Sequence, residues 1–129
     1  MKYQSKIIAN DSYGLQTISA LCVGAEIKVS DIKYLQNNKV FLMSLQRSKV
    51  EAENKDNKTN SIVVFSFVDS VKSKNIKQDN PDLKLELLAI DHLKNKEKYE
   101  IHLIFTNNSY IVLSSEIIDV NLEDQQKIN

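Results

Sequence analysis

Two Asn-Asn pairs, Asn37-Asn38 and Asn107-Asn108, each stand between stretches in which apolar and polar residues alternate. Alternation with a period of two places successive side chains on opposite faces of a β-strand. The chain has only 2 Gly and 1 Pro, so Asn, which tolerates a positive φ better than most residues, has to form many of the tight turns. Each pair therefore predicts the turn of a β-hairpin, and the pattern favours a sheet of antiparallel neighbours.

Other stretches predict further strands. The segment Ser61–Val68 is β-branched and aromatic on both faces, which is typical of a strand that is covered on both sides. We expect it to continue after a bend at Asp69-Ser70. Residues 46–60 are polar and have no apolar period, which predicts a long exposed loop or a hairpin tip. The other expected strands lie at 2–9, 25–36 with a kink at Ser30-Asp31, 39–45, 71–77, 83–91, 99–106 and 110–114.

Two segments have helical spacing. Apolar residues between Leu15 and Cys22 recur every three or four positions, after the capping side chains of Asn10-Asp11-Ser12. We therefore expect one helix at about 11–22 and a closing helix at about 116–126. The sum is a single domain, 1–129, of the α+β class, with a mostly antiparallel sheet or partly closed barrel of about seven strands and a short helix near each end. The order of elements also fits a pleckstrin-homology-like barrel.

Composition excludes several kinds of function. Lys and Arg total 17, as do Asp and Glu, so no general affinity for nucleic acid or membrane follows. A single cysteine, Cys22, excludes an intramolecular disulfide and a zinc site of several thiolates. No glycine-rich loop supports nucleotide chemistry, and no stretch approaches the ~20 apolar residues of a membrane span. We expect a cytoplasmic protein without a cofactor, with Cys22 buried as an unreactive thiol.

The imidazoles of His92 and His102 are the main candidates for chemistry. Together with Asp91 they suggest a metal-dependent or acid/base enzyme, if the strands that carry them bring them into one pocket. Further groups would assist such a site, namely Asp31, Arg47, Glu51 and Asp69. No short metal-ligand motif accompanies these residues, so we expect no bound metal, and the enzyme stays an alternative.

Lys72 and Lys74 share one face of an expected strand, with Lys77 nearby. Such a group can contact phosphates, which makes weak RNA binding a third hypothesis. Aromatic side chains that would stack on bases are missing there, so binding of nucleic acid is disfavoured. A strand edge protected by lysine is the favoured interpretation, because Lys opposes edge-to-edge pairing.

Phrases along nearly the whole chain resemble an uncharacterised alphaproteobacterial family, a domain of unknown function. The matching phrases, in order, are Ile8-Ala9-Asn10-Asp11, Leu15–Ala20, Val29–Tyr34, Arg47, Ile101–Phe105 and Ile111–Asp124. Two positions depart from the family's pattern: Val50-Glu51 stands where a Trp-Glu pair is common, and Asn107-Asn108-Ser109 replaces a Gly-rich turn. The resemblance supports the fold and the localisation and implies no activity.

We therefore expect a small non-enzymatic binding or accessory module. A strand that is apolar on both faces, with Phe65 and Phe67 against Val64 and Val68, needs a partner on one face if the helices cannot cover it. The partner would be another protein or a second copy of the chain, engaged through a sheet face or edge. The candidate binding residues are Arg47, Glu51, Lys72 and Lys74.

Overall fold

The computed structural model describes residues 6–48 and 58–125. Within these residues the chain forms ten strands, one α-helix and two short 3-10 turns. Their bounds are β1 (Lys6–Ala9), α1 (Ser12–Cys22), β2 (Glu26–Lys28), η1 (Val29–Asp31), β3 (Ile32–Leu35), η2 (Gln36–Asn38), β4 (Val40–Ser48), β5 (Lys58–Phe65), β6 (Val68–Lys74), β7 (Lys84–Asn95), β8 (Lys98–Phe105), β9 (Tyr110–Ser115) and β10 (Val120–Asp124).

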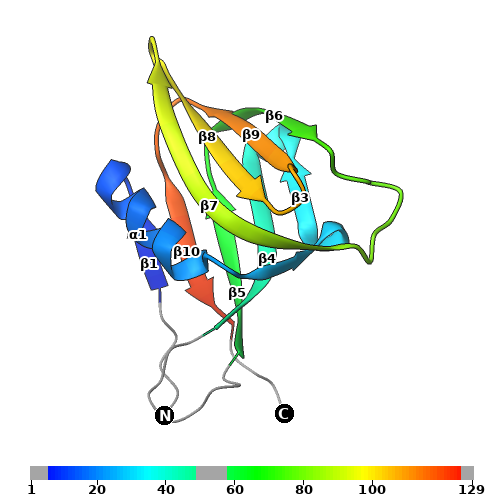
Figure 1. The fold of residues 1–129 in the computed structure, drawn as a ribbon. Coiled ribbons are helices and arrows are strands. Elements are labelled where there is room, and N and C mark those ends of the chain that lie inside the picture. Colours follow the sequence, from blue (N-terminus) through cyan, green and yellow to red (C-terminus); the bar gives the residue numbers. More distant parts are fainter. Residues whose placement is uncertain (1–5, 49–57, 126–129) are drawn as a thin grey trace.

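The strands form one antiparallel sheet that is not closed into a barrel. Its order is β1-β10-β5-β4-β2-β7-β8-β9-β6, and β3 pairs with β4 beside β2. Because the short strand β2 pairs with both β4 and β7, it joins two layers. In Figure 1 the layer β7-β8-β9-β6 lies across the layer that contains β10, β5 and β4, with α1 at one side.

In the long strands every second side chain is apolar and points inward, and these side chains form the core between the two layers. In β8, Ile101, Leu103 and Phe105 are buried, while the residues between them face outward. β4 and β5 contribute Phe41 and Phe65 from paired positions, and their rings meet edge to face with centroids 5.9 Å apart. This alternation confirms the antiparallel, mostly sheet architecture that the sequence predicts.

Helix α1 confirms the first expected helix. The Asp11 side chain accepts a hydrogen bond of 2.8 Å from the backbone N–H of Gly14, as an N-cap does. Leu15, Ile18 and Cys22 form the buried side. The Ser19 hydroxyl accepts a hydrogen bond of 2.9 Å from the backbone N–H of Ile90, so the helix lies beside β7 beyond the part of that strand that pairs with β2.

Both Asn-Asn hairpins are present, with different turn geometry. Asn107 and Asn108 have φ values of 64° and 57° between β8 and β9, as expected of Asn residues in a tight turn. Between β3 and β4 the 3-10 turn η2 contains Asn37 and Asn38, and the left-handed residue is Lys39, with φ 55°. The sequence locates both hairpins. In the turn between β3 and β4, however, the residue with a positive φ is Lys39, one position after the Asn-Asn pair.

The expected closing helix at 116–126 is wrong for residues 116–125, and residue 126 lies outside the described residues. Val120, Leu122 and Asp124 are buried at alternate positions of β10, which pairs with β1 and β5. Pairing with two neighbours overrides the helical spacing of Ile117 with Val120 and of Ile118 with Leu122, because it satisfies the backbone groups on both sides. The described helix lies near the N-terminus, so the pleckstrin-homology-like comparison loses its closing helix.

The sheet has ten strands rather than about seven, because β10 replaces the expected closing helix and one expected strand is divided in two. The expected kink at Ser30-Asp31 divides 25–36 into β2 and β3. The bend after β5 occurs at Ser66-Phe67, before the predicted Asp69-Ser70, and Phe67 has φ 60°. The polar segment 46–60 is strand at both ends, up to Ser48 and from Lys58, and residues 49–57 of that expected loop lie outside the described residues.

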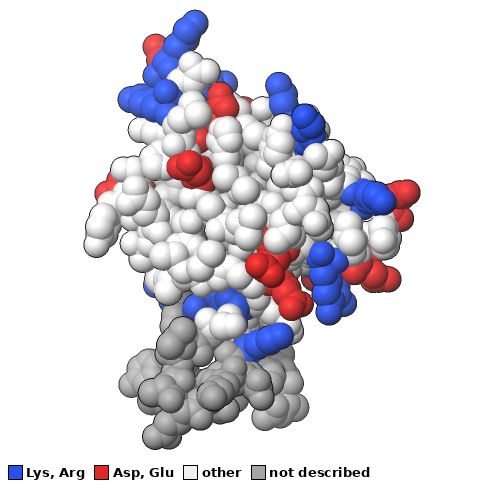
Figure 2. All heavy atoms as spheres, viewed as in Figure 1, with Lys and Arg blue, Asp and Glu red and all other residues white. Residues whose placement is uncertain are grey.

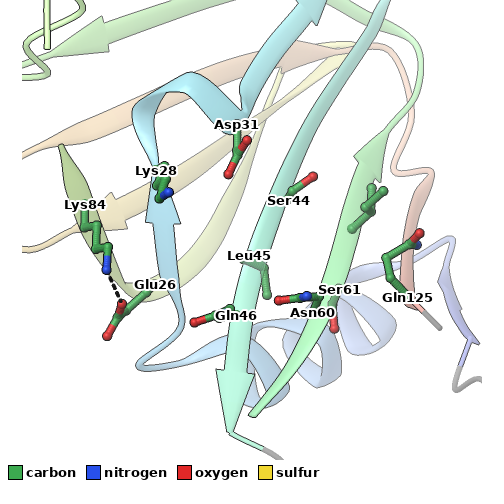
Figure 3. A pocket seen from close by; sticks show the side chains of 11 residues that line it. Glu26, Lys28, Asp31, Ser44, Leu45, Gln46, Asn60, Ser61, Lys84 and Gln125 are labelled. Atoms are coloured by element: carbon green, nitrogen blue, oxygen red, sulfur yellow. Dashed lines mark ion pairs between the residues drawn. The ribbon is translucent and has the colours of Figure 1, made fainter. Parts of the chain in front are cut away.

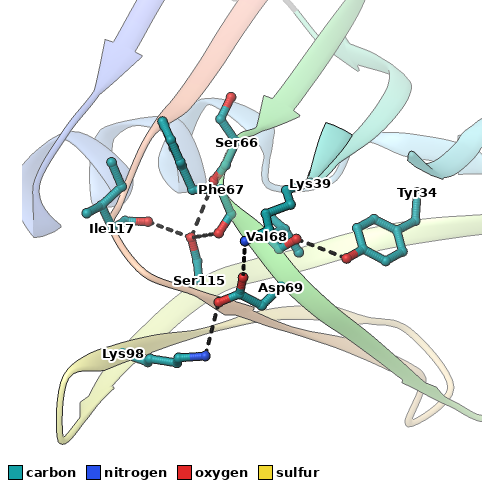
Figure 4. A network of polar contacts seen from close by, with 9 residues as sticks. All are labelled: Tyr34, Lys39, Ser66, Phe67, Val68, Asp69, Lys98, Ser115 and Ile117. Carbon is teal, nitrogen blue, oxygen red and sulfur yellow. Dashed lines mark hydrogen bonds and ion pairs between the residues drawn. The ribbon is translucent and has the colours of Figure 1, made fainter. Parts of the chain in front are cut away.

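Hydrogen bonds at the bend explain its position (Figure 4). The Ser115 hydroxyl donates to the carbonyl oxygen of Ile117 at 2.6 Å and lies 3.1 Å from that of Phe67. The backbone N–H of Val68 donates to the carbonyl of Lys39 at 2.8 Å, and Tyr34 donates its hydroxyl to the carbonyl of Val68 at 2.9 Å. These bonds connect the start of β6 to β3 and η2, on the opposite layer.

Candidate functional site

The structure does not bring the two histidines to one site. Asp91 and His102 are paired positions of β7 and β8, and His92 is paired with Ile101. Ile101 is buried and His102 lies on the outward side of β8. Because neighbouring residues of a strand point to opposite faces, His92 and His102 face opposite sides of the sheet. Among the described residues no group of three His, Cys, Asp or Glu side chains is arranged to hold a metal.

The expected helpers of that site are also scattered. Asp31 is in η1, in the segment between β2 and β3. Asp69 is in β6, where it pairs with Lys39 at 3.2 Å and with Lys98 at 3.1 Å. Hydrogen bonds from Lys98 and then Lys39 lower the pKa of Asp69 below its usual value. Glu51 lies outside the described residues. The geometry therefore does not favour an acid/base enzyme built on Asp91, His92 and His102.

Arg47 lies in the protein interior, where it forms an ion pair with Asp124. It is 5% exposed and Asp124 is 3% exposed. Nη2 of Arg47 donates to both carboxylate oxygens of Asp124, at 2.8 and 3.0 Å, and its Nε donates to Oδ1 at 3.2 Å. The Ser61 hydroxyl donates to the same Oδ1 at 2.6 Å. This forked ion pair joins β4, β5 and β10 at one end of the core.

Sequence reasoning missed Asp124 as the partner of Arg47. The signal was present in the alternation of Val120, Leu122 and Asp124, which places a carboxylate on the inner face if the segment is a strand. The assignment of a helix to 116–126 concealed this alternation.

Cys22 is buried, as the sequence predicts. Burial raises the pKa of its thiol to about 11, the positive charge of Arg47 opposes this, and Asp124 adds to it. A thiol with that pKa is protonated at neutral pH, so it lacks the thiolate that nucleophilic catalysis requires.

A polar groove lies between β2 and β4 (Figure 3). The two strands share a single pair, Glu26 with Gln46, before β3 rejoins β4, and the opening has a volume of about 530 Å³. Glu26 lies 3.9 Å from the ammonium group of Lys84 and 4.0 Å from that of Lys58. Since charges of both signs compensate each other there, the groove gives no preference for an anion or a cation.

A second hollow lies on the outward side of β7, β8 and β9, and we call the outward side of these three strands and β6 the outer face. Its apolar part consists of Leu88, 44% exposed, Ile104 and Tyr110, each 37% exposed, and the adjoining Val112. Cross-strand register places Ile104 opposite Tyr110. A bulge in β7 between Leu87 and Ala89 turns Leu88 outward beside them. The hollow has a volume of about 640 Å³.

Charged residues flank the apolar part of the outer face. Lys72 and Lys74 lie on β6, opposite Val112 and Tyr110, and they line a second depression together with Glu100. The carboxylate of Glu100 lies 3.3 Å from Nε2 of His102. β6 is the last strand in the sheet order, so the two lysines lie on an edge strand, as the sequence predicts.

Figure 2 shows uncharged atoms over much of the middle of one side of the molecule, where β7 and β8 lie in Figure 1. Lysine side chains gather at the tip of the β7–β8 hairpin, at the top of the same view. Among the described residues no helix has the length and apolar character needed to cross a membrane.

These observations define a class of protein: an antiparallel β protein with one short helix near its start and an exposed apolar hollow on one sheet face. Residues 5–129 match the sequence model of the family described as a protein of unknown function, DUF2948. The chain belongs to this family, which confirms the resemblance seen in the sequence to an uncharacterised domain of unknown function. Comparisons with curated proteins and with solved structures give no match.

Proposed function

We propose that this protein is a non-enzymatic binding module of the cytoplasm whose outer face docks another protein chain. The observation that carries the proposal is the hollow lined by the exposed side chains of Leu88, Ile104 and Tyr110 and by the half-buried Val112. Contiguous apolar side chains that are rimmed by polar groups mark interaction sites on proteins, because covering them removes apolar surface from water.

The charges around the hollow favour a protein over RNA as the occupant. Lys72 and Lys74 share their depression with Glu100, whose carboxylate repels a phosphate backbone. The sequence predicts no aromatic side chain beside these lysines, and this is wrong, because Tyr110 lies opposite Lys74. Single-stranded RNA is nevertheless usually held by several stacked rings. A protein partner can match both the apolar centre and the two signs of charge.

Site-specific photocrosslinking in living cells tests this proposal. A photoreactive phenylalanine analogue at position 104 is expected to form a covalent adduct with the docked protein chain, seen as a product of one defined mass. The same analogue at Tyr13, an exposed aromatic residue of α1, is the matched control and is expected to give none. Absence of an adduct from position 104, or equal adducts from both positions, contradicts the proposal.

A further inference from the structure

We infer that the chain which docks on the outer face is a second copy of this protein, related to the first by a two-fold axis. This inference rests on the proposed function and names its partner. One row of side chains across the outer face carries it, because the charges at the two ends of this row are complementary when one copy is turned over onto the other.

The row consists of four residues that lie opposite one another on β6, β9, β8 and β7. Register across the four strands places Lys72 opposite Val112, Val112 opposite His102, and His102 opposite Asp91. Lys72 and Asp91 are therefore at opposite ends of the row, three strand spacings or roughly 14 Å apart. Within the described residues neither forms an ion pair, and Asp91 accepts a hydrogen bond of 2.8 Å from the backbone N–H of His92. The row ends in two charges of opposite sign that have no counterion from this part of the chain.

A two-fold axis that lies parallel to the strands, between β8 and β9, exchanges the two ends of this row. β6 of one copy then lies over β7 of the other. Lys72 meets Asp91 of the second copy, and Asp91 meets Lys72 of the second copy, so one contact gives two equivalent ion pairs. Val112 and His102 lie between the two ion pairs, and in the adjoining row Ile104 meets Tyr110 of the second copy. This is the isologous arrangement of most two-fold dimers.

The alternative contact through the sheet edge is disfavoured. β6 is a terminal strand, and its exposed lysines oppose pairing with the same strand of another copy, because like charges would approach one another. The face is small: four strands by about five residues measures roughly 14 Å by 14 Å between backbones. Stable dimers commonly bury about 800 Å² per partner, so we expect a reversible dimer whose population rises with protein concentration.

Analytical ultracentrifugation of the 129-residue chain tests the inference through charge reversal. Wild type is expected to show a monomer–dimer equilibrium. Lys72→Asp and Asp91→Lys are each expected to weaken the dimer roughly tenfold or more, because each places like charges at two equivalent contacts, at a cost of about 1.4 kcal/mol or more. Lys28→Asp, at an exposed residue of β2 that lines the groove between β2 and β4, makes the same change in net charge as Lys72→Asp and is expected to leave the dimer unchanged.

A mixture of the two variants gives the decisive measurement. When K72D meets D91K, the new carboxylate at position 72 faces the new ammonium at position 91, and the native Lys72 and Asp91 of the two chains face each other. The mixture is therefore expected to dimerise about as well as wild type, while neither variant does so alone. A variant that fails to fold cannot give this recovery.

Two results would overturn the inference: a wild type that is monomeric at every concentration, or a mixture no more dimeric than its components. The crosslink from position 104 separates this failure from failure of the proposed function. An adduct with a different protein, together with a monomeric wild type, refutes the second copy and leaves the docking face in place. No adduct at all refutes both.

Discussion

Arg47 and Asp124 show how two charges are accommodated at the end of an apolar core. Removing charge from water is costly, and the cost is offset when forked hydrogen bonds satisfy both partners. Here the guanidinium makes three contacts with the carboxylate, and the Ser61 hydroxyl adds one. The pair also fixes the position of β10 relative to β4, strands that are both neighbours of β5. Its position inside the fold favours a structural role over direct contact with a partner.

We expect Arg47→Met to destabilise the protein by about 3–5 kcal/mol, because it leaves the Asp124 carboxylate buried without its cation. Urea denaturation measures the loss. Arg47→Lys, which keeps the charge but not the fork, is expected to lose less. In the double variant R47M/D124N the carboxylate charge is also removed, so its loss should be smaller than the sum of the single losses. A loss below about 1 kcal/mol for R47M would contradict this account.

Cys22 is expected to be inert in the folded protein. Its pKa of about 11 leaves very little thiolate at pH 8, and its side chain is fully buried. Alkylation by iodoacetamide at pH 8 should therefore be at least roughly a hundredfold slower in the native protein than in urea, where an ordinary thiol pKa of ~8.5 applies. Mass spectrometry follows both rates. Equal rates in the two conditions would show that the thiol is accessible and ionised.

Among the elements, helix α1 contains a glycine, Gly14, whose role becomes clear only from how the helix packs. From the sequence alone, Gly14 in the first turn is expected to destabilise the helix, since glycine costs about 1 kcal/mol relative to alanine in a helix. The structure supplies the reason for the residue: a Cβ at position 14 would lie 2.9 Å from both Cα and Cβ of Ala9. The helix thus begins in close contact with the end of β1, which no local pattern in the sequence reveals.

Gly14→Ala is accordingly expected to destabilise the protein, opposite in sign to the gain of about 1 kcal/mol that helix propensity alone gives. Thermal unfolding measures the change. Ala20→Gly, at an exposed position of the same helix, is the control and is expected to cost about 1 kcal/mol through propensity. A stabilised G14A would mean that α1 can move away from β1 without loss.

At the scale of the molecule, the local sequence pattern predicts the structure of single strands and hairpins. It fails where the structure of a segment depends on pairing with strands that are distant in the sequence. The hairpin at Asn107-Asn108 and the cap at Asp11 depend on neighbours in the sequence, so they were predictable. In residues 116–125 Ile118 and Leu122 are four positions apart, as on one side of a helix, and only the availability of β1 and β5 as neighbours makes Val120–Asp124 a strand. The outer face combines side chains of four strands, so its row of Lys72, Val112, His102 and Asp91 follows from register alone.

Contacts between the layers stabilise the open sheet, and the ion pairs of Asp69 are among them (Figure 4). Its carboxylate joins Lys39, beside η2, to Lys98 at the start of β8. Because these contacts lower the pKa of Asp69 in the folded state, they stabilise the fold above the carboxyl's unfolded pKa of ~3.9. This contribution is lost as the pH falls through the lower, folded value.

Asp69→Asn is therefore expected to lower the melting temperature at pH 7 and to make a smaller difference at pH 2, because the stabilising charge of the wild-type carboxylate is lost progressively as the pH falls through its lowered pKa. Differential scanning calorimetry at the two pH values measures both gaps. Asp82→Asn, in an exposed turn, is the control and is expected to leave the melting temperature unchanged at pH 7. A gap between wild type and D69N of equal size at both pH values would mean that Asp69 acts through its shape and hydrogen bonds, and that its charge does not connect the two layers.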